Sequence, residues 1–341
     1  MKLDKDISNK IYWGRFICAV SVIAIHSVNN SIKGILYNVE YIIRDYVLCY
    51  AVPFFFVLSG FFFYYGMEDA VFRSKWIKRM KKQIYLYLFW NLLYTLVHTL
   101  YVTARNTRFA LSILGESIVE PSVSLKKFWG GGLFYRYSGH WWFMFQLILL
   151  IVMAPLIWKA AQKKATLIVF ILFVVMLAVL QGLEWIKVPY IVFYSFVYYL
   201  CGVYIVRYRR DILISKYKIR TGICIVLASE IAKVVLTCFV GENFHWITSL
   251  PLAIGLWWIF NNIKVGKECT SEWRISFLMY AVHPAMATVM FKVWEWIIPN
   301  KDVLLFLCYL AQPFIITLII MLVAKAIRKR KIYRWLTGER I

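Results

Sequence analysis

The chain has 341 residues, of which 62% are hydrophobic, and its mean hydropathy is +0.67. One soluble core of this size could not enclose so much apolar surface, so the composition excludes a soluble globular protein and predicts an integral membrane protein. The net charge of +23 is compatible with nucleic-acid binding only if the basic residues cluster for that purpose, and their positions favour another explanation.

Apolar runs of about 20 residues, the length that crosses a bilayer as an α-helix, recur along the whole chain. Segments of alternating hydrophobicity, typical of outer-membrane barrels, are not found. The sequence therefore predicts an all-α integral membrane protein with about ten transmembrane helices, and we interpret residues 1–341 as one membrane domain. The predicted spans are 11–29, 46–66, 83–103, 140–158, 166–182, 190–206, 222–240, 244–261, 275–297 and 303–325.

The basic residues indicate how these spans are oriented. With the N-terminus in the cytoplasm, the cytoplasmic segments, with Lys325 at the end of the last span counted among them, carry 28 of the 40 Lys and Arg residues, and the external segments carry nine. This is the distribution that the positive-inside rule requires, so both termini are predicted to be cytoplasmic, with a basic tail from about residue 326. The charge is thus mainly a topology signal, and we expect a lipid bilayer and no nucleic acid as the partner.

The first predicted span contains two polar residues, Arg15 and His26, within an otherwise apolar stretch. Eleven residues at 100° each end about 20° beyond three full turns, so both side chains share one face of a helix, roughly 16 Å apart along its axis. In the predicted topology Arg15 lies near the cytoplasmic end and His26 in the outer half. Ionisable groups at such depths usually face a bundle interior or a water-filled cavity. A snorkelling arginine and a satisfied core histidine are the structural alternative.

The second span reads "VPFFFVLSGFFFYYG", with Ser59 and Gly60 among phenylalanines. Small residues at this place allow two helices to approach closely, and they could equally let a thin ligand pass beside the backbone. Pro53 is expected to kink the helix and free a carbonyl near its start.

Five basic residues precede the third span, between Lys75 and Lys82. Anchoring at the cytoplasmic surface explains most of them. A cytoplasmic ligand with several phosphates would also bind here, because Arg79 and Lys82 lie one turn apart, with Lys78 beside them.

The fourth span is preceded by residues 104–139, the long external connection of the predicted topology. Its 36 residues could cap an external opening, hold a short interfacial helix, or form an exposed loop. His140 and Trp142 follow it at the outer entry of the span, where an interfacial position is the default for such side chains.

The ninth span contains "YAVHPAM", in which Tyr280 and His283 lie one turn apart on the same face. Eight residues separate His283 from the predicted cytoplasmic end of the helix, which places it about 12 Å from that end. Pro284 loosens the helical hydrogen bonding at this point. The histidines lack metal-ligand spacing and the cysteines form no CxxC pair, so no metal is expected.

Five stretches together resemble the acyltransferase 3 family of membrane proteins. They are the pair Arg15 and His26, "PFFFVLSGFFF", "KRMKKQIYLYLFW", "HWWFMFQLILLI" and "YAVHP", in the family's order and spacing. The resemblance implies a multi-pass protein of the bacterial plasma membrane that O-acylates a saccharide or another envelope molecule. The donor would be cytoplasmic acyl-CoA, most simply acetyl-CoA.

The resemblance also implies roles for individual residues. Arg15 and His26 fall on the arginine–histidine pair taken as essential for transfer, and Ser59 falls on the serine of the SGF segment. Arg79 falls on the basic position before the third span, and His283 on a histidine often found late in the domain. The family commonly has arginine where this chain has lysine, at position 82, and lysine cannot make arginine's bidentate contact with phosphate.

In this interpretation His26 is the catalytic base toward an acceptor hydroxyl, or it carries the acyl group briefly as acyl-imidazole, and Arg15 acts with it. The predicted donor-binding residues are Arg79, Lys82, Lys78, Ser59 and Gly60. The predicted acceptor-binding residues are His283, Tyr280, His140 and Trp142.

A second class of function is also compatible with the sequence. The membrane modules of vancomycin-resistance serine racemases are related to this family, and the second span resembles theirs as well. Such a module binds or transports a small amino acid such as L-serine, and Arg15 would hold its carboxylate. Binding of CoA distinguishes the two functions, since only an acyltransferase requires it. A structural or sensing role is the third alternative.

Overall fold

The computed structural model describes residues 5–27, 32–105, 139–188, 191–214, 219–263, 275–298 and 302–337. Within these ranges the ordered elements are helices, and none of the residues forms a β-strand. The chain divides into two compact units. Unit 1 comprises Met1–Met67, Ala160–Trp185 and Phe193–Ile341, and unit 2 comprises Glu68–Lys159 and Ile186–Val192.

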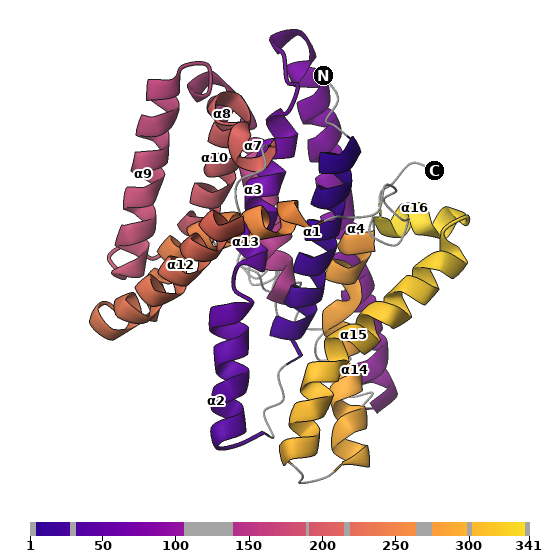
Figure 1. The fold of residues 1–341 in the computed structure, drawn as a ribbon. Coiled ribbons are helices and arrows are strands. Elements are labelled where there is room, and N and C mark those ends of the chain that lie inside the picture. The colour runs from indigo at the N-terminus through magenta and orange to yellow at the C-terminus, as the bar shows by residue number, and fades with distance from the viewer. Residues whose placement is uncertain are drawn as a thin grey trace. The chain divides into compact units, whose positions relative to one another are not determined.

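Unit 1 begins with α1 (Lys5–Ile25), which is followed by α2 (Ile35–Ile42), a π-helical turn η1 (Ile43–Val47) and α3 (Ala51–Tyr64). Pro53 lies in the first turn of α3, where a missing backbone N–H is tolerated, and the expected break precedes it. Figure 1 shows α2 and α3 as separate helices that follow one another. The predicted second span is thus the later part of a longer helical run.

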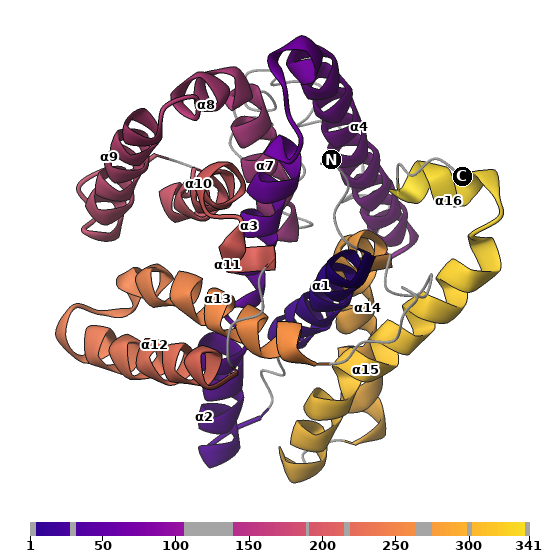
Figure 2. The ribbon, with the colours of Figure 1, turned by 45° about the horizontal axis from the view of Figure 1, so that its top comes forward.

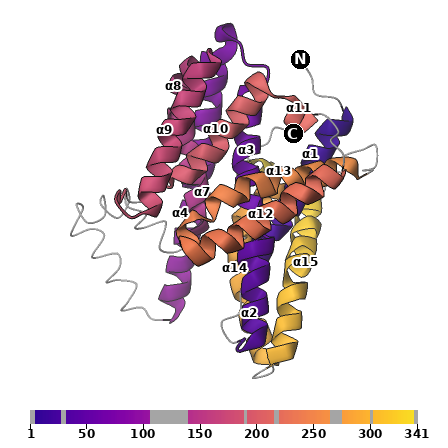
Figure 3. The same cartoon turned by 60° about the vertical axis from the view of Figure 1, so that its left-hand side comes forward.

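The remainder of unit 1 is also helical. Its elements are α9 (Lys164–Gly182), α10 (Phe193–Tyr208), α11 (Asp211–Ile214), α12 (Ile219–Phe239), the 3₁₀ turn η3 (Glu242–Phe244), α13 (Trp246–Asn262), α14 (Ser276–Ile297), α15 (Asp302–Ile327) and α16 (Lys331–Thr337). Helix α1 packs against α3, α13, α14 and α15. Helix α10 packs against α3 and α9, as Figure 2 shows, and α12 lies beside α13 (Figure 3).

The contact between α3 and α10 depends on two glycines. A Cβ atom added at Gly60 would lie 2.1 Å from the carbonyl oxygen of Tyr199, and one added at Gly202 would lie 2.1 Å from the carbonyl oxygen of Val57. The two backbones therefore touch directly at this crossing, as small residues permit in membrane helices.

Unit 2 is built on α4 (Asp69–Arg105), a helix of 37 residues. It also contains the 3₁₀ turn η2 (Gly139–Trp141), α7 (Trp142–Val152) and α8 (Ala154–Ala160). The indole N–H of Trp76 donates to the carbonyl of Ile151 (2.7 Å), and the amide of Gln83 donates to the sulfur of Met144 (2.8 Å). The order of these contacts shows that α4 and α7 run antiparallel.

The predicted all-helical class is confirmed. Among the described residues, five helical runs are long and apolar enough to cross a membrane: Ile35–Tyr64, Lys164–Gly182, Ser276–Ile297, Ile219–Phe239 and Asp302–Ile327. The pair α7 and α8, bent by 58°, gives a sixth if it is one span. Helices also occupy the other predicted spans, including α10 and α13 with 16 and 17 residues. The number of ten spans and the cytoplasmic termini stay predictions, and the long connection 104–139 lies almost wholly outside the described residues.

Candidate active site

Arg15 and His26 lie on one continuous helix, as their spacing predicted. Helix α1 ends at Ile25, and the backbone N–H of His26 still donates to the carbonyls of Val22 (3.2 Å) and Ile23 (3.1 Å). The eleven residue steps from Arg15 to His26 correspond to about 16 Å of helix and three turns. Arg15 is half-buried, whereas His26 is exposed at the end of the helix.

His26 contacts a second histidine from a distant part of the sequence. The ring centroids of His26 and His283 are 5.0 Å apart, with their planes inclined at 46°. His283 is completely buried in α14, and the Tyr280 ring lies 6.2 Å from it. The structure thus brings together His26, His283 and Tyr280, three of the predicted site residues.

The sequence did not predict this contact. The predicted span ends placed His26 in the outer half of the membrane and His283 about 12 Å from the cytoplasmic end. The two rings lie side by side in the structure, and their depths in a membrane stay predictions. Residue counting gives positions along one helix, whereas the offset between two helices is decided by how α1 and α14 pack.

Pro284 explains how the His283 ring is held. In an α-helix the N–H of residue 284 would donate to the carbonyl of Tyr280, but proline has no N–H. The Nδ1 atom of His283 lies 2.8 Å from that carbonyl oxygen and 3.1 Å from the carbonyl oxygen of Met279. A carbonyl can only accept, so Nδ1 carries the hydrogen, and the neutral ring has its lone pair on Nε2.

Three contacts fix α1 within unit 1. The ammonium of Lys10, which is 3% exposed, donates to the carbonyl of Asn261 (2.9 Å) at the C-terminal end of α13, where a cation also complements the helix dipole. Gly14 packs against the rings of Trp257 and Phe54. Higher on the helix, the hydroxyl of Ser21 lies 2.9 Å from that of Tyr50.

The second predicted motif serves helix packing. Gly60 is buried at the crossing of α3 and α10, so the explanation by close helix approach describes what the structure shows. Ser59 is half-buried on the same helix. Passage of a ligand beside Ser59 and Gly60 stays a prediction.

The predicted basic cluster forms a stripe along α4 in unit 2. Lys75, Lys78, Arg79 and Lys82 fall within an arc of about 100° on a helical projection, one to two turns from end to end. Trp76 and Gln83, which contact α7, lie on an adjoining face. Lys78 and Lys82 are exposed and Arg79 is half-buried, so a polyanion could reach several of these charges at once.

Unit 2 also contains His140 and Trp142, the remaining predicted residues. His140 is 6% exposed and packs between Trp141 (4.8 Å between ring centroids) and Tyr94 (5.5 Å). Trp142 is half-buried and contacts Phe143. The buried tryptophan of the "HWW" motif is therefore Trp141, which the sequence did not single out because both tryptophans are equally apolar.

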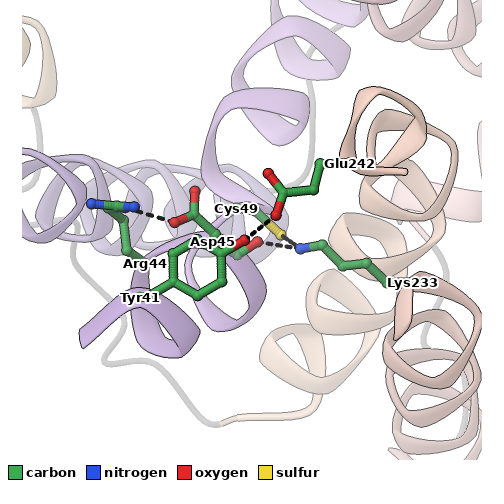
Figure 4. Close-up of polar contacts among 6 residues, drawn as sticks. All are labelled: Tyr41, Arg44, Asp45, Cys49, Lys233 and Glu242. Atoms are coloured by element: carbon green, nitrogen blue, oxygen red, sulfur yellow. Dashed lines mark hydrogen bonds and ion pairs between the residues drawn. The ribbon is translucent and has the colours of Figure 1, made fainter. Parts of the chain in front are cut away.

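A further polar cluster lies in unit 1, around Lys233 of α12 (Figure 4). Lys233 is 1% exposed, and its ammonium donates to the backbone carbonyl of Asp45 in η1 and to the sulfur of Cys49 (2.9 Å). It also lies 4.6 Å from the centroid of the Tyr46 ring, within the range of a cation–π contact. The only signal in the sequence was a charged residue inside the span 222–240.

Neighbouring contacts join the same elements. The hydroxyl of Tyr41 donates to Glu242 (2.5 Å), and Arg44 pairs with Asp45 (2.7 Å). The bond of Tyr41 connects α2 to the turn between α12 and α13, whereas the pair of Arg44 and Asp45 lies within η1. Because η1 also contacts α1, this cluster supports the helix that carries His26.

The fold and the site together define an all-helical membrane protein in which two histidines meet at the end of the first helix. The model of the acyltransferase domain family matches residues 9–323, which contain Arg15, His26 and His283. The chain therefore belongs to the acyltransferase 3 family of membrane acyltransferases. No curated protein and no solved structure matches the chain.

Proposed function

We propose that the protein is an O-acyltransferase of the cell membrane. It moves an acyl group, most simply acetyl, from cytoplasmic acyl-CoA to a hydroxyl of a saccharide or another envelope molecule. The observation that carries the proposal is the exposed His26 at the end of α1, beside the buried His283 and three turns from Arg15. Membership of the acyltransferase 3 family supports the reaction class.

In this reaction the acceptor oxygen attacks the acyl carbon of the thioester. The new C–O bond forms as the C–S bond breaks, and His26 takes the hydroxyl proton and passes it to the CoA thiolate. A neutral imidazole suits this step near pH 7. The step is redox-neutral, because the proton lost by the acceptor is the one gained by CoA.

Each unit, considered by itself, offers basic residues as candidates for contacts with the donor. In unit 1, Arg15 carries a positive charge on the same helix as His26. In unit 2, the stripe of Lys78, Arg79 and Lys82 offers several cations to the phosphates of CoA. The requirement for more than one phosphate contact distinguishes CoA from a simple carboxylate ligand.

Calorimetric titration of acetyl-CoA into the purified full chain, in parallel with turnover measurements, tests the proposal. Wild type should bind, Arg15→Ala should bind weakly, and His26→Ala should bind like wild type but release no thiol. Lys329→Ala, which removes an exposed cation in the tail, is the matched control and should resemble wild type. If wild type instead shows no binding of acetyl-CoA but releases heat when L-serine is added, the protein is an amino-acid-binding module.

A further inference from the structure

We propose that His283 is a positioning residue that fixes the tautomer and the orientation of His26, and that Pro284 makes this possible. His283 would accept a hydrogen bond at Nε2 from one nitrogen of the His26 ring, and the other nitrogen would then face the acceptor hydroxyl. The inference rests on the proposed role of His26 as the base.

The first step is the tautomer of His283. The carbonyl of Tyr280 has no backbone donor because residue 284 is proline. The Nδ1–H group of His283 replaces that donor at 2.8 Å. The ring is thereby held in one orientation, and its Nε2 is an acceptor as long as the ring is neutral.

The second step is the distance between the rings. Each ring nitrogen lies roughly 1 Å from the ring centroid, so centroids 5.0 Å apart allow an N–H···N hydrogen bond of about 3 Å. His283 is completely buried, whereas His26 is exposed. A small rotation of the exposed ring therefore completes the bond, and the buried ring stays in place.

The third step is the consequence for catalysis. A base works when the nitrogen that faces the substrate has the lone pair, and a third group commonly ensures this by accepting from the other nitrogen. A neutral imidazole left to itself populates both tautomers. His283 would select the productive tautomer of His26 without touching the substrate, which differs from the acceptor-binding role first assigned to it.

Three variants of the full chain in lipid nanodiscs separate positioning from a purely structural role. His283→Asn keeps a donor near the place of Nδ1 but lacks the Nε2 acceptor. His283→Gln puts an amide oxygen near the place of Nε2. Pro284→Ala restores the backbone N–H toward the carbonyl of Tyr280, and so frees the His283 ring while the helix is kept.

The assay follows thiol release from acetyl-CoA, with water and then chitooligosaccharides as acceptors, together with thermal unfolding. We expect kcat to fall about 100-fold in His283→Asn and in Pro284→Ala, the cost of a small misplacement of a reacting group, with KM for acetyl-CoA unchanged. The unfolding temperature should be unchanged or higher in Pro284→Ala. His283→Gln should recover much of the rate.

Wild-type rates in His283→Asn and Pro284→Ala would overturn the inference while the proposed function stood, provided that His26→Ala is inactive. Turnover that persists in His26→Ala, or is absent from wild type, would overturn the proposed function instead. A readout independent of turnover is the ¹⁵N spectrum of histidine-labelled protein, assigned by comparison with His283→Asn. It should show an unprotonated Nε2 at His283 in wild type, and a protonated Nε2 there would overturn the inference.

Discussion

Gly60→Ala tests whether Gly60 serves helix packing. The added Cβ would lie 2.1 Å from the carbonyl oxygen of Tyr199, 3.0 Å from its carbonyl carbon and 3.3 Å from the backbone nitrogen of Val203. All three atoms belong to the backbone of α10, so no side-chain rotation removes the overlap. The helices α3 and α10 must separate by about 1 Å to restore ordinary contact.

The size of the effect follows from that separation. A gap of 0.5–1 Å forfeits about a quarter to a half of each dispersion contact across the interface. Overpacking of this kind typically costs about 1–3 kcal/mol, and backbone on both sides places Gly60→Ala near the upper end. Gly202→Ala meets the carbonyl oxygen of Val57 at the same 2.1 Å and should cost as much. The double variant should cost less than the sum, because one separation relieves both overlaps.

Unfolding of the purified full chain by SDS in mixed micelles, followed by tryptophan fluorescence, measures these free energies. Ser59→Ala is the matched control. It changes the residue next to Gly60 on α3 but adds no Cβ atom at the helix crossing, so this variant should unfold like wild type. Gly60→Ala should change the free energy of acetyl-CoA binding, measured on the folded fraction, by less than it changes the free energy of unfolding. A Gly60→Ala protein with wild-type stability would refute the close approach of α3 and α10.

Three further substitutions test other contacts. Lys233→Met removes the buried ammonium that donates to the carbonyl of Asp45 and should lower the free energy of unfolding by about 1–3 kcal/mol in the same SDS titration. Lys10→Ala removes the donor to the carbonyl of Asn261 at the end of α13 and should cost about 1–2 kcal/mol. Lys82→Glu reverses an exposed charge of the α4 stripe and should weaken acetyl-CoA binding about tenfold at low salt, and less at high salt, as calorimetry would show.

Each of these substitutions has a control elsewhere on the chain. Lys5→Ala changes an exposed lysine in the first turn of α1 and should leave stability unchanged. Lys329→Glu reverses an exposed charge of the tail and should leave acetyl-CoA binding unchanged. Equal effects of Lys82→Glu and Lys329→Glu would show that only net charge matters, and a neutral Lys233→Met would show that its contacts with η1 add no stability.

The sequence predicted the helical class because apolar runs of span length leave few alternatives. It did not predict α2 or η1, since residues 30–45 carry charges and were interpreted as an external connection. A π-helical turn has no compositional signature of its own. Here the carbonyl of Asp45 in this turn accepts a hydrogen bond from the ammonium of Lys233, a tertiary contact that the local sequence does not reveal.

The candidate site, like the fold, could be predicted from the sequence only in part. Helical periodicity alone placed Arg15 and His26 on one face of α1, because both belong to one regular element. The meeting of His26 with His283 could not be predicted, since it requires the offset between α1 and α14. The role of Pro284 could be predicted only in part. A proline within a helix predicts a carbonyl that lacks its backbone N–H donor, but it does not show which side chain donates to that carbonyl instead.

Buried polar side chains in unit 1 repeatedly occur where a helix backbone is interrupted. Lys10 contacts the end of α13, Lys233 contacts the π-helical turn, and His283 contacts the carbonyl freed by Pro284. A polar residue in a membrane span therefore needs a structural explanation before a chemical one, because an unsatisfied carbonyl in such a place costs several kcal/mol. His26 differs from these residues, since its ring is exposed and contacts another imidazole. That difference makes His26 the stronger candidate for a chemical role. His283 fits both a structural and a chemical explanation, because its Nδ1–H donates to the carbonyl freed by Pro284 and its Nε2 is an acceptor.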